Sequence, residues 1–571
     1  MFIKVSMVLI FFAITIGIGA YFRKRTSSVN DFVLGGRAVG PWLTAFSYGT
    51  TYFSAVVFVG YAGQFGWKFG TAAVWIGLGN AFVGSLLPWV IIGKRTRVMT
   101  NHLKSATMPE FFGARYVSSA LKIAAALIVF VFLIPYTASL YNGLSRLFEM
   151  AFGIDFIYCI IAMAVLTAVY VVLGGYFGSA VNDFIQGLVM IVGIVAVIAT
   201  VLKDNGGFID ASAGLAAVQG ANVKGAVVPG VFTSFFGPDP MALLGVVLLT
   251  SLGTWGLPQM VARFYSIKSE KVIFKGAVIS TIFALIIAGG CYFLGSFSNL
   301  YSKSVEYTVE GTLNDGIAVG GTIETLLEEN KLVLTDNVIK GNVSGTIIED
   351  LNVSGSNITG VLDGIDIKGK VIYDSIIPNI LSKFSDLLIG LIILLVFAAS
   401  ISTLSSLVLV SSSTLTLDFI KGNLVKKMSD KKQLLIIRAL IVVFIIISAA
   451  IAILQYQKNL IFIAQMMGIS WGALAGSFLA PFLYGLYWKK ATKLSVWCCF
   501  IFSTVVMTSN VILNLFFNDI FLKVFPKILQ SSINCGAFVM LAGLIIVPVV
   551  SMFSKAPDKA SLDSSFACYD K

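Results

Sequence analysis

Hydroxyl side chains gather in one apolar stretch of the chain, at residues 380–415. Ser402 and Ser406 are four residues apart and Ser405 is three residues from Ser402, so on a helix they share one face. Thr403 lies on the neighbouring face. Small hard cations prefer oxygen ligands, so the pattern offers two adjacent cation sites. The alternative is that each hydroxyl donates to a carbonyl oxygen of its own helix.

A second polar cluster interrupts the apolar stretch at residues 41–62, where Gly49, Thr50, Thr51 and Ser54 lie mid-span. A glycine beside two β-branched threonines favours a break in a helix. A break frees backbone carbonyls, which bind a cation where they line a cavity inside a membrane protein. Small residues that allow close helix packing explain the same composition, and the sequence leaves both interpretations open.

Asp183 is the only acidic residue of the apolar stretch at 178–202, and it follows the pair Gly174 and Gly175. A charge inside such a stretch needs a partner, and no Lys or Arg lies nearby in the sequence. A bound cation is one way to supply that partner. The alternative is an acid in the first turn of a helix, where the helix dipole stabilises it.

Membrane-spanning helices must position these groups. Hydrophobic residues make up 57% and charged residues 12% of the 571 residues, whereas soluble domains carry about 25% charged residues. About thirteen apolar stretches approach the length of roughly 20 residues that spans a bilayer. They lie at residues 2–22, 41–62, 70–93, 120–150, 156–175, 178–202, 241–263, 272–300, 380–415, 433–455, 459–486, 493–516 and 532–553. We therefore predict an all-α polytopic membrane protein.

The positive charges indicate the orientation. If the first stretch begins outside, the loops placed inside carry 26 of the 40 Lys and Arg residues, as the positive-inside rule requires. This predicts a multi-pass protein of the plasma membrane with an external N-terminus and a cytoplasmic C-terminus. It also explains the net charge of +12 by topology and contact with lipid headgroups, without nucleic-acid binding.

Residues 301–375 differ from the rest, because Val and Ile alternate there with Gly, Asn, Thr and Asp. The pattern predicts a small extracellular β-rich insert of hairpins or a short solenoid turn. A flexible insertion is the alternative. The insert divides a transmembrane domain that covers residues 1–553, and residues 554–571 form a cytoplasmic tail.

Catalytic and metal-binding motifs are not indicated. The six cysteines form no CxxC pair, and the only histidine, His102, lies in a basic stretch that is predicted to be a solvated loop. The apolar stretches contain no HExxH motif, no nucleophile–histidine pair and no paired acids. We therefore expect no enzyme activity and no cofactor.

Several ordered motifs resemble the sodium/solute symporter family, and in particular its sodium/pantothenate and sodium/proline branches. The similarity runs from about residue 23 to 550, apart from the insert. The motifs are Asp31 to Arg37, Ser54 with Gly60, Leu173 to Gly175, Asp183 to Gln186, Gly256 to Gln259 with Arg263, Ala398 to Ser406 with Asp418, and Gly485 to Lys490.

This resemblance implies a five-plus-five inverted repeat of the leucine-transporter type, with alternating access and sodium as the coupling ion. The main sodium site would take the backbone carbonyls of Thr50, Phe53 and Ala399 and the hydroxyls of Ser402 and Thr403. A second sodium site would take Asp183, Ser402, Ser405 and Ser406. Because all of these hydroxyls are present, two sodium ions per cycle are expected.

The expected substrate is a small organic carboxylate or an amino acid. Val57 and Gly77 stand where sodium/galactose carriers have Gln and Glu, which counts against a sugar. Tyr52 stands where sodium/proline carriers have an acid, which counts against proline itself. The candidate substrate residues are Tyr52, Ser54, Val56, Val57, Tyr136, Trp255 and Gln465. Ordinary packing of aromatic side chains in a helix bundle is the alternative.

Two other functions are compatible with the same spans. A proton-coupled carrier would use Asp183 as its proton site. A membrane sensor that reuses the fold is disfavoured, because no output domain follows the last span. The predicted partners are therefore the solute, sodium and the lipid bilayer, with no nucleic acid and no obligate protein partner.

Overall fold

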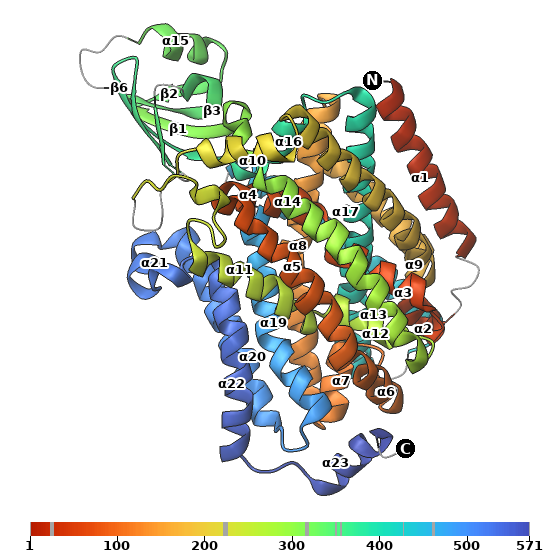
Figure 1. Ribbon diagram of the computed structural model, residues 1–571. Coiled ribbons are helices and arrows are strands. Elements are labelled where there is room, and N and C mark those ends of the chain that lie inside the picture. Colours follow the sequence, from red (N-terminus) through yellow and green to blue (C-terminus); the bar gives the residue numbers. More distant parts are fainter. Residues whose placement is uncertain are drawn as a thin grey trace.

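Helices that run the length of the molecule form one bundle, and a small sheet lies at one end of it (Figure 1). The computed structural model describes residues 2–22, 28–220, 226–313, 319–348, 351–354, 357–425, 428–458 and 463–569. The first helix begins at the end of the bundle that carries the sheet, and the C-terminal segment lies at the opposite end.

Eleven helical segments of the described residues are long and apolar enough to cross a membrane, so the prediction of an all-α membrane protein is confirmed. The longest helices are α1 (Phe2–Phe22), α8 (Ser119–Phe152), α9 (Phe156–Asp204), α17 (Asp386–Thr414), α18 (Asp430–Lys458), α19 (Ile463–Tyr487), α20 (Lys493–Phe516) and α22 (Ser532–Phe553). Other spans consist of consecutive shorter helices, namely α5 (Val74–Ala81) through α6 (Lys94–His102), and α13 (Ile273–Ala284) with α14 (Gly290–Ser296).

The fifth and sixth predicted spans, 156–175 and 178–202, are joined in α9. The junction is a kink at Gly175, whose φ of 57° and ψ of −169° are not helical. Side chains with a Cβ are strained at such a positive φ, so glycine is required there. The kink divides α9, and the part from Gly174 to Asp204 is one of the eleven segments long and apolar enough to cross a membrane, whereas Phe156–Val169 is a shorter apolar helix.

Two spans are broken near their middle. In the first, α3 (Pro41–Tyr52) ends at Phe53, which is extended with φ −106° and ψ 104°. The chain then continues into the π-helix η3 (Val56–Tyr61) and α4 (Ala62–Phe69). The second break separates α11 (Pro240–Leu252) from α12 (Pro258–Tyr265).

The first break lies after the predicted Gly49-Thr50-Thr51 segment, which remains helical. The Phe53 N–H still donates to the Gly49 carbonyl at 3.0 Å, so the helical ladder continues to that residue. The Ser54 hydroxyl then accepts a hydrogen bond from the Val56 N–H at 3.3 Å, which caps the following helix. Gly49 serves packing instead, because a Cβ there would overlap the ring of Phe283.

The insert contains a six-stranded antiparallel sheet in the order β2-β3-β1-β6-β5-β4. Its strands are β1 (Glu306–Thr312), β2 (Leu332–Thr335), β3 (Val338–Ser344), β4 (Asn352–Ser354), β5 (Asn357–Leu362) and β6 (Ile365–Val371), and α15 (Gly321–Glu328) precedes β2. Alternate residues of β1 and β6 are buried, among them Tyr307, Val309 and Ile367. The period-two pattern of the sequence therefore forms hairpins in one sheet, and the described strands form no solenoid turn.

The C-terminal segment folds back against the bundle (Figure 1). Its helix α23 (Lys559–Phe566) is followed by Tyr569, whose hydroxyl donates to the Arg95 carbonyl at 3.0 Å. His102 lies in this contact, because its Nε2 is 2.7 Å from the Ser564 carbonyl oxygen. His102 is exposed, as expected, but it ends α6 and does not lie in a loop.

Candidate functional site

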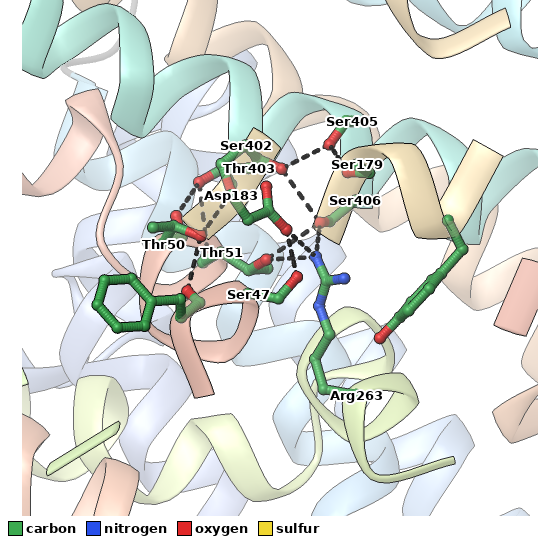
Figure 2. Close-up of polar contacts among 12 residues, drawn as sticks. Ser47, Thr50, Thr51, Ser179, Asp183, Arg263, Ser402, Thr403, Ser405 and Ser406 are labelled. Carbon is green, nitrogen blue, oxygen red and sulfur yellow. Dashed lines mark hydrogen bonds and ion pairs between the residues drawn. The ribbon is translucent and has the colours of Figure 1, made fainter. Parts of the chain in front are cut away.

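Helix α17 lies beside the end of the broken helix α3, and oxygen atoms of both helices converge there (Figure 2). The Thr403 hydroxyl lies 3.1 Å from the Thr50 carbonyl oxygen and 3.3 Å from the Thr51 carbonyl oxygen. It also lies 3.0 Å from the carbonyl oxygen of Ala399 on its own helix. The Ser402 hydroxyl donates to the Thr50 hydroxyl at 2.8 Å.

Of the five predicted main-site ligands, the Thr403 hydroxyl contacts the carbonyls of Thr50 and Ala399, and the Ser402 hydroxyl contacts the Thr50 side chain beside them. Phe53, the fifth, lies in the extended turn that ends α3. The carbonyl of Thr51 was not predicted and belongs to the same group. Thr403 donates to a carbonyl of its own helix, as the alternative interpretation expects, and it also contacts carbonyls of the neighbouring helix.

Asp183 lies on the second half of α9 and is fully buried. One of its oxygens, Oδ2, accepts a hydrogen bond from the Ser47 hydroxyl. The same oxygen is 3.5 Å from Nη2 of Arg263 on α12. The charged partner that is absent from the local sequence is therefore supplied by a distant helix. The other oxygen, Oδ1, is buried and accepts no hydrogen bond from the described residues.

Arg263 joins Asp183 to the hydroxyl cluster (Figure 2). Its Nη2 donates to the Thr51 hydroxyl at 2.6 Å and to the Ser406 hydroxyl. Those two hydroxyls are themselves 3.0 Å apart. The guanidinium therefore contacts two of the four predicted second-site residues, Asp183 and Ser406.

The two remaining second-site residues have different surroundings. The Ser405 hydroxyl is 2.8 Å from that of Ser179 on α9, and it also donates to the Ser402 carbonyl. The Ser402 hydroxyl donates to the Thr50 hydroxyl in the main-site group, and it also lies close to the Asp183 carboxylate. Sequence reasoning missed Ser47, Ser179 and the role of Arg263. Only the motif at 256–263 pointed to that arginine, because no spacing rule connects α12 with α9.

Aromatic side chains surround the break after α3. The Tyr52 ring stacks on Phe53 at 4.2 Å between centroids and on Trp471 of α19 at 6.0 Å. Tyr136 of α8 meets the other edge of Trp471, also at 6.0 Å. Trp471 was not predicted, because a lone aromatic residue in an apolar stretch has no distinguishing pattern. The Tyr136 hydroxyl and the Trp471 indole N–H are buried and lie close to each other, and the Tyr136 hydroxyl also lies close to Ser54, but neither completes a hydrogen bond of normal geometry among the described residues.

The other candidate substrate residues fall into two groups. Val56 and Val57 are buried in η3, two and three residues after Ser54, and the Trp255 indole N–H donates to the Val83 carbonyl at 2.9 Å. Gln465 instead lines a more open cavity of about 450 Å³ between α4, α11, α19 and α22. Its neighbours there include Lys68, Asp239 and Lys527.

The family model described as "Sodium:solute symporter family" matches residues 32–314 and 367–498. The chain belongs to the sodium:solute symporter family. This symporter is therefore a multi-pass membrane protein that couples solute import to sodium by alternating access, and it is not an enzyme. The unmatched residues 315–366 fall within the insert.

Curated relatives and a solved structure are also similar to this symporter. It is 28% identical over 497 residues to "Sodium/proline symporter 2" of Staphylococcus saprophyticus, a match that covers 85% of this chain and 82% of the relative. It is 29% identical over 499 residues to the sodium/proline symporter of Staphylococcus aureus, covering 85% and 81%. The structure of a Na⁺-coupled sialic acid symporter in a substrate-bound outward-open state matches with a TM-score of 0.65 and 18% identity, covering 98% of this chain and 99% of that one. The predicted leucine-transporter-type fold is thereby confirmed.

Proposed function

We propose that this symporter imports a small organic carboxylate or an amino acid together with two sodium ions. The observation that carries the proposal is the oxygen cluster at which the Thr403 hydroxyl meets the Thr50 and Ala399 carbonyls. The end of a broken helix supplies one of these carbonyls, as expected for a coupling-ion site at the middle of a membrane. A sodium ion held there would tie α3 of one repeat to α17 of the other.

Two ions also suit the energetics of uptake. One sodium ion gains about 2.3 kcal/mol per 100 mV of membrane potential and about 1.4 kcal/mol from a tenfold gradient. One ion therefore supports roughly 500-fold accumulation and two support roughly 10⁵-fold. The second ion is assigned to Asp183, Ser402, Ser405 and Ser406.

The substrate is assigned to the break after α3. Two buried donors that lie close together, the Tyr136 hydroxyl and the Trp471 indole N–H, complete no hydrogen bond of normal geometry among the described residues and suit a carboxylate or another acceptor. The N-terminal end of the helix after Ser54 also favours negative charge. The Trp471 ring, stacked with Tyr52 and edge-to-face with Tyr136, suits a small apolar body. Proline is the substrate printed for the two curated relatives, and it belongs in the first set of compounds to test.

The orientation proposed from the basic loops places the N-terminus and the sheet outside and the C-terminus in the cytoplasm of a plasma-membrane protein. Basic side chains at the C-terminal end support it: Arg95 and Arg115 contact the aromatic rings of Tyr569 and Phe566. No obligate protein partner is required by this proposal. The side of the membrane on which the sheet lies can be tested with a Lys368→Cys variant. A membrane-impermeant thiol reagent added outside should label this cysteine in intact cells.

A thermal-shift screen of the purified protein tests the function. Amino acids, small carboxylates, vitamins and sugars are added with and without sodium, and the stabilising compounds are then used in uptake by proteoliposomes. The expected result is a compound that stabilises the protein only with sodium and whose uptake is driven by an inward sodium gradient. Equal uptake in potassium buffer with a pH gradient would favour the proton-coupled carrier.

A further inference from the structure

The second sodium site already contains a positively charged side chain. Nη2 of Arg263 contacts Asp183 Oδ2, the Thr51 hydroxyl and the Ser406 hydroxyl (Figure 2). Both charged side chains are buried, with 2% of the Arg263 side chain and none of the Asp183 side chain exposed. Among the described residues, Arg263 is the only charged side chain within ion-pair distance of Asp183. One carboxylate therefore offsets one cation.

A sodium ion on Asp183 and Ser406 would share its ligands with this guanidinium. Two cations beside one buried carboxylate leave a positive charge without compensation, which a low-dielectric interior strongly disfavours. The two cations are therefore expected to alternate. Sodium would bind as Arg263 withdraws, and Arg263 would return as sodium leaves.

Space and an aromatic ring beside Arg263 could accept its guanidinium when it moves away from Asp183. A small cavity of about 20 Å³, large enough for roughly one water molecule, lies beside it and is lined in part by Tyr176, Ser179, Gln259 and Ser406. The guanidinium carbon is 5.1 Å from the centre of the Tyr176 ring, which can hold a cation on its face. Arg263 also lies on α12, the short helix after the second break, so its movement would engage a broken span.

We propose that the Arg263 guanidinium neutralises Asp183 when the second sodium site is empty. Sodium and the guanidinium then replace each other on the Asp183 carboxylate during transport. This proposal rests on the second site proposed above and adds a gating role for α12. When sodium leaves, the ion pair between Arg263 and Asp183 re-forms and draws α12 toward α9. When the sodium-free protein reorients for the next cycle, the Asp183 carboxylate is therefore still paired with a positive charge.

A different arrangement gives the opposite prediction. Asp183 Oδ1 accepts no hydrogen bond from the described residues, so sodium could bind to that oxygen while Arg263 stays on Oδ2. In that case the guanidinium would help to hold the carboxylate in place. Removal of Arg263 would then leave sodium binding unchanged or weaken it.

Sodium titrations of purified Arg263→Gln and Arg263→Lys separate the two arrangements. Tryptophan fluorescence and thermal stability are measured in detergent, with N-methylglucamine replacing sodium. If the guanidinium occupies the site nine-tenths of the time, removing it tightens sodium binding about tenfold. Arg263→Gln should therefore bind sodium about tenfold more tightly than wild type. Without sodium, its thermal stability should be lower than that of the wild type. Arg263→Lys should keep a near wild-type affinity, because it retains the charge.

Control variants show whether a negative result refutes only the exchange of sodium with Arg263 or also the second sodium site. Arg115→Gln removes another buried arginine, one that bonds to the Gly485 and Trp488 carbonyls, and should leave sodium affinity unchanged. The tightening in Arg263→Gln should vanish when Asp183→Asn is added. An unchanged or weaker affinity in Arg263→Gln, with an Asp183-dependent second ion still bound, refutes the exchange alone. If Asp183→Asn leaves sodium binding of the wild type unaltered, the second site itself is refuted.

Discussion

Thr403→Val is the sharpest test of the main sodium site, because it keeps the shape of the side chain and removes one oxygen. That oxygen lies within 3.3 Å of three carbonyl oxygens, those of Thr50, Thr51 and Ala399. Loss of a partner from a buried polar group costs about 1–3 kcal/mol. If most of this cost falls on the ion-bound state, the sodium half-saturation constant rises roughly 5- to 150-fold.

The assay is sodium-dependent uptake into proteoliposomes, together with a sodium titration of thermal stability. Thr403→Ser restores the hydroxyl and should bind sodium nearly as wild type does. Ser400→Ala is the matched control, since Ser400 is equally buried on α17 but donates only to Val396 of its own helix, at 2.7 Å. If Thr403→Val and Ser400→Ala both stay within about twofold of wild type, the main site does not lie at this contact.

Three further predictions concern other parts of the molecule. Asp183→Asn should lower the Hill coefficient for sodium from near two toward one in uptake assays; an unchanged coefficient would make Asp183 structural. A Cβ at Gly84 would overlap the Tyr52 hydroxyl, so Gly84→Ala should weaken substrate-dependent stabilisation much more than sodium-dependent stabilisation, and equal losses would argue against Tyr52 as a substrate residue. Burial raises the pKa of Asp374, so the stability it contributes is present below its unfolded pKa of about 3.9 and is lost as pH rises through the raised value. Thermal melts of Asp374→Asn across pH 4–8 should show a flatter pH dependence than wild type, and an identical profile would contradict the assignment.

Membership of the membrane-protein class and the placement of the polar clusters could both be predicted from the sequence. Apolar stretches of sufficient length fix where helices cross lipid, because a bilayer leaves the backbone few alternatives. The helical period likewise places Ser402, Ser405 and Ser406 together. The break after α3 was located only approximately, because Gly49 is used for packing and the helical ladder continues to Phe53.

What the sequence by itself determined was a set of polar groups at membrane depth that require partners. Which partners they have depends on helix packing, and that was decided only by the tertiary structure. Asp183 shows the difference, because its apolar surroundings demand a compensating charge, yet local sequence cannot indicate that Arg263 of α12 supplies it. Electrostatic pairing acts through space over a few ångströms, so residues far apart in the chain become partners only when packing brings their helices together.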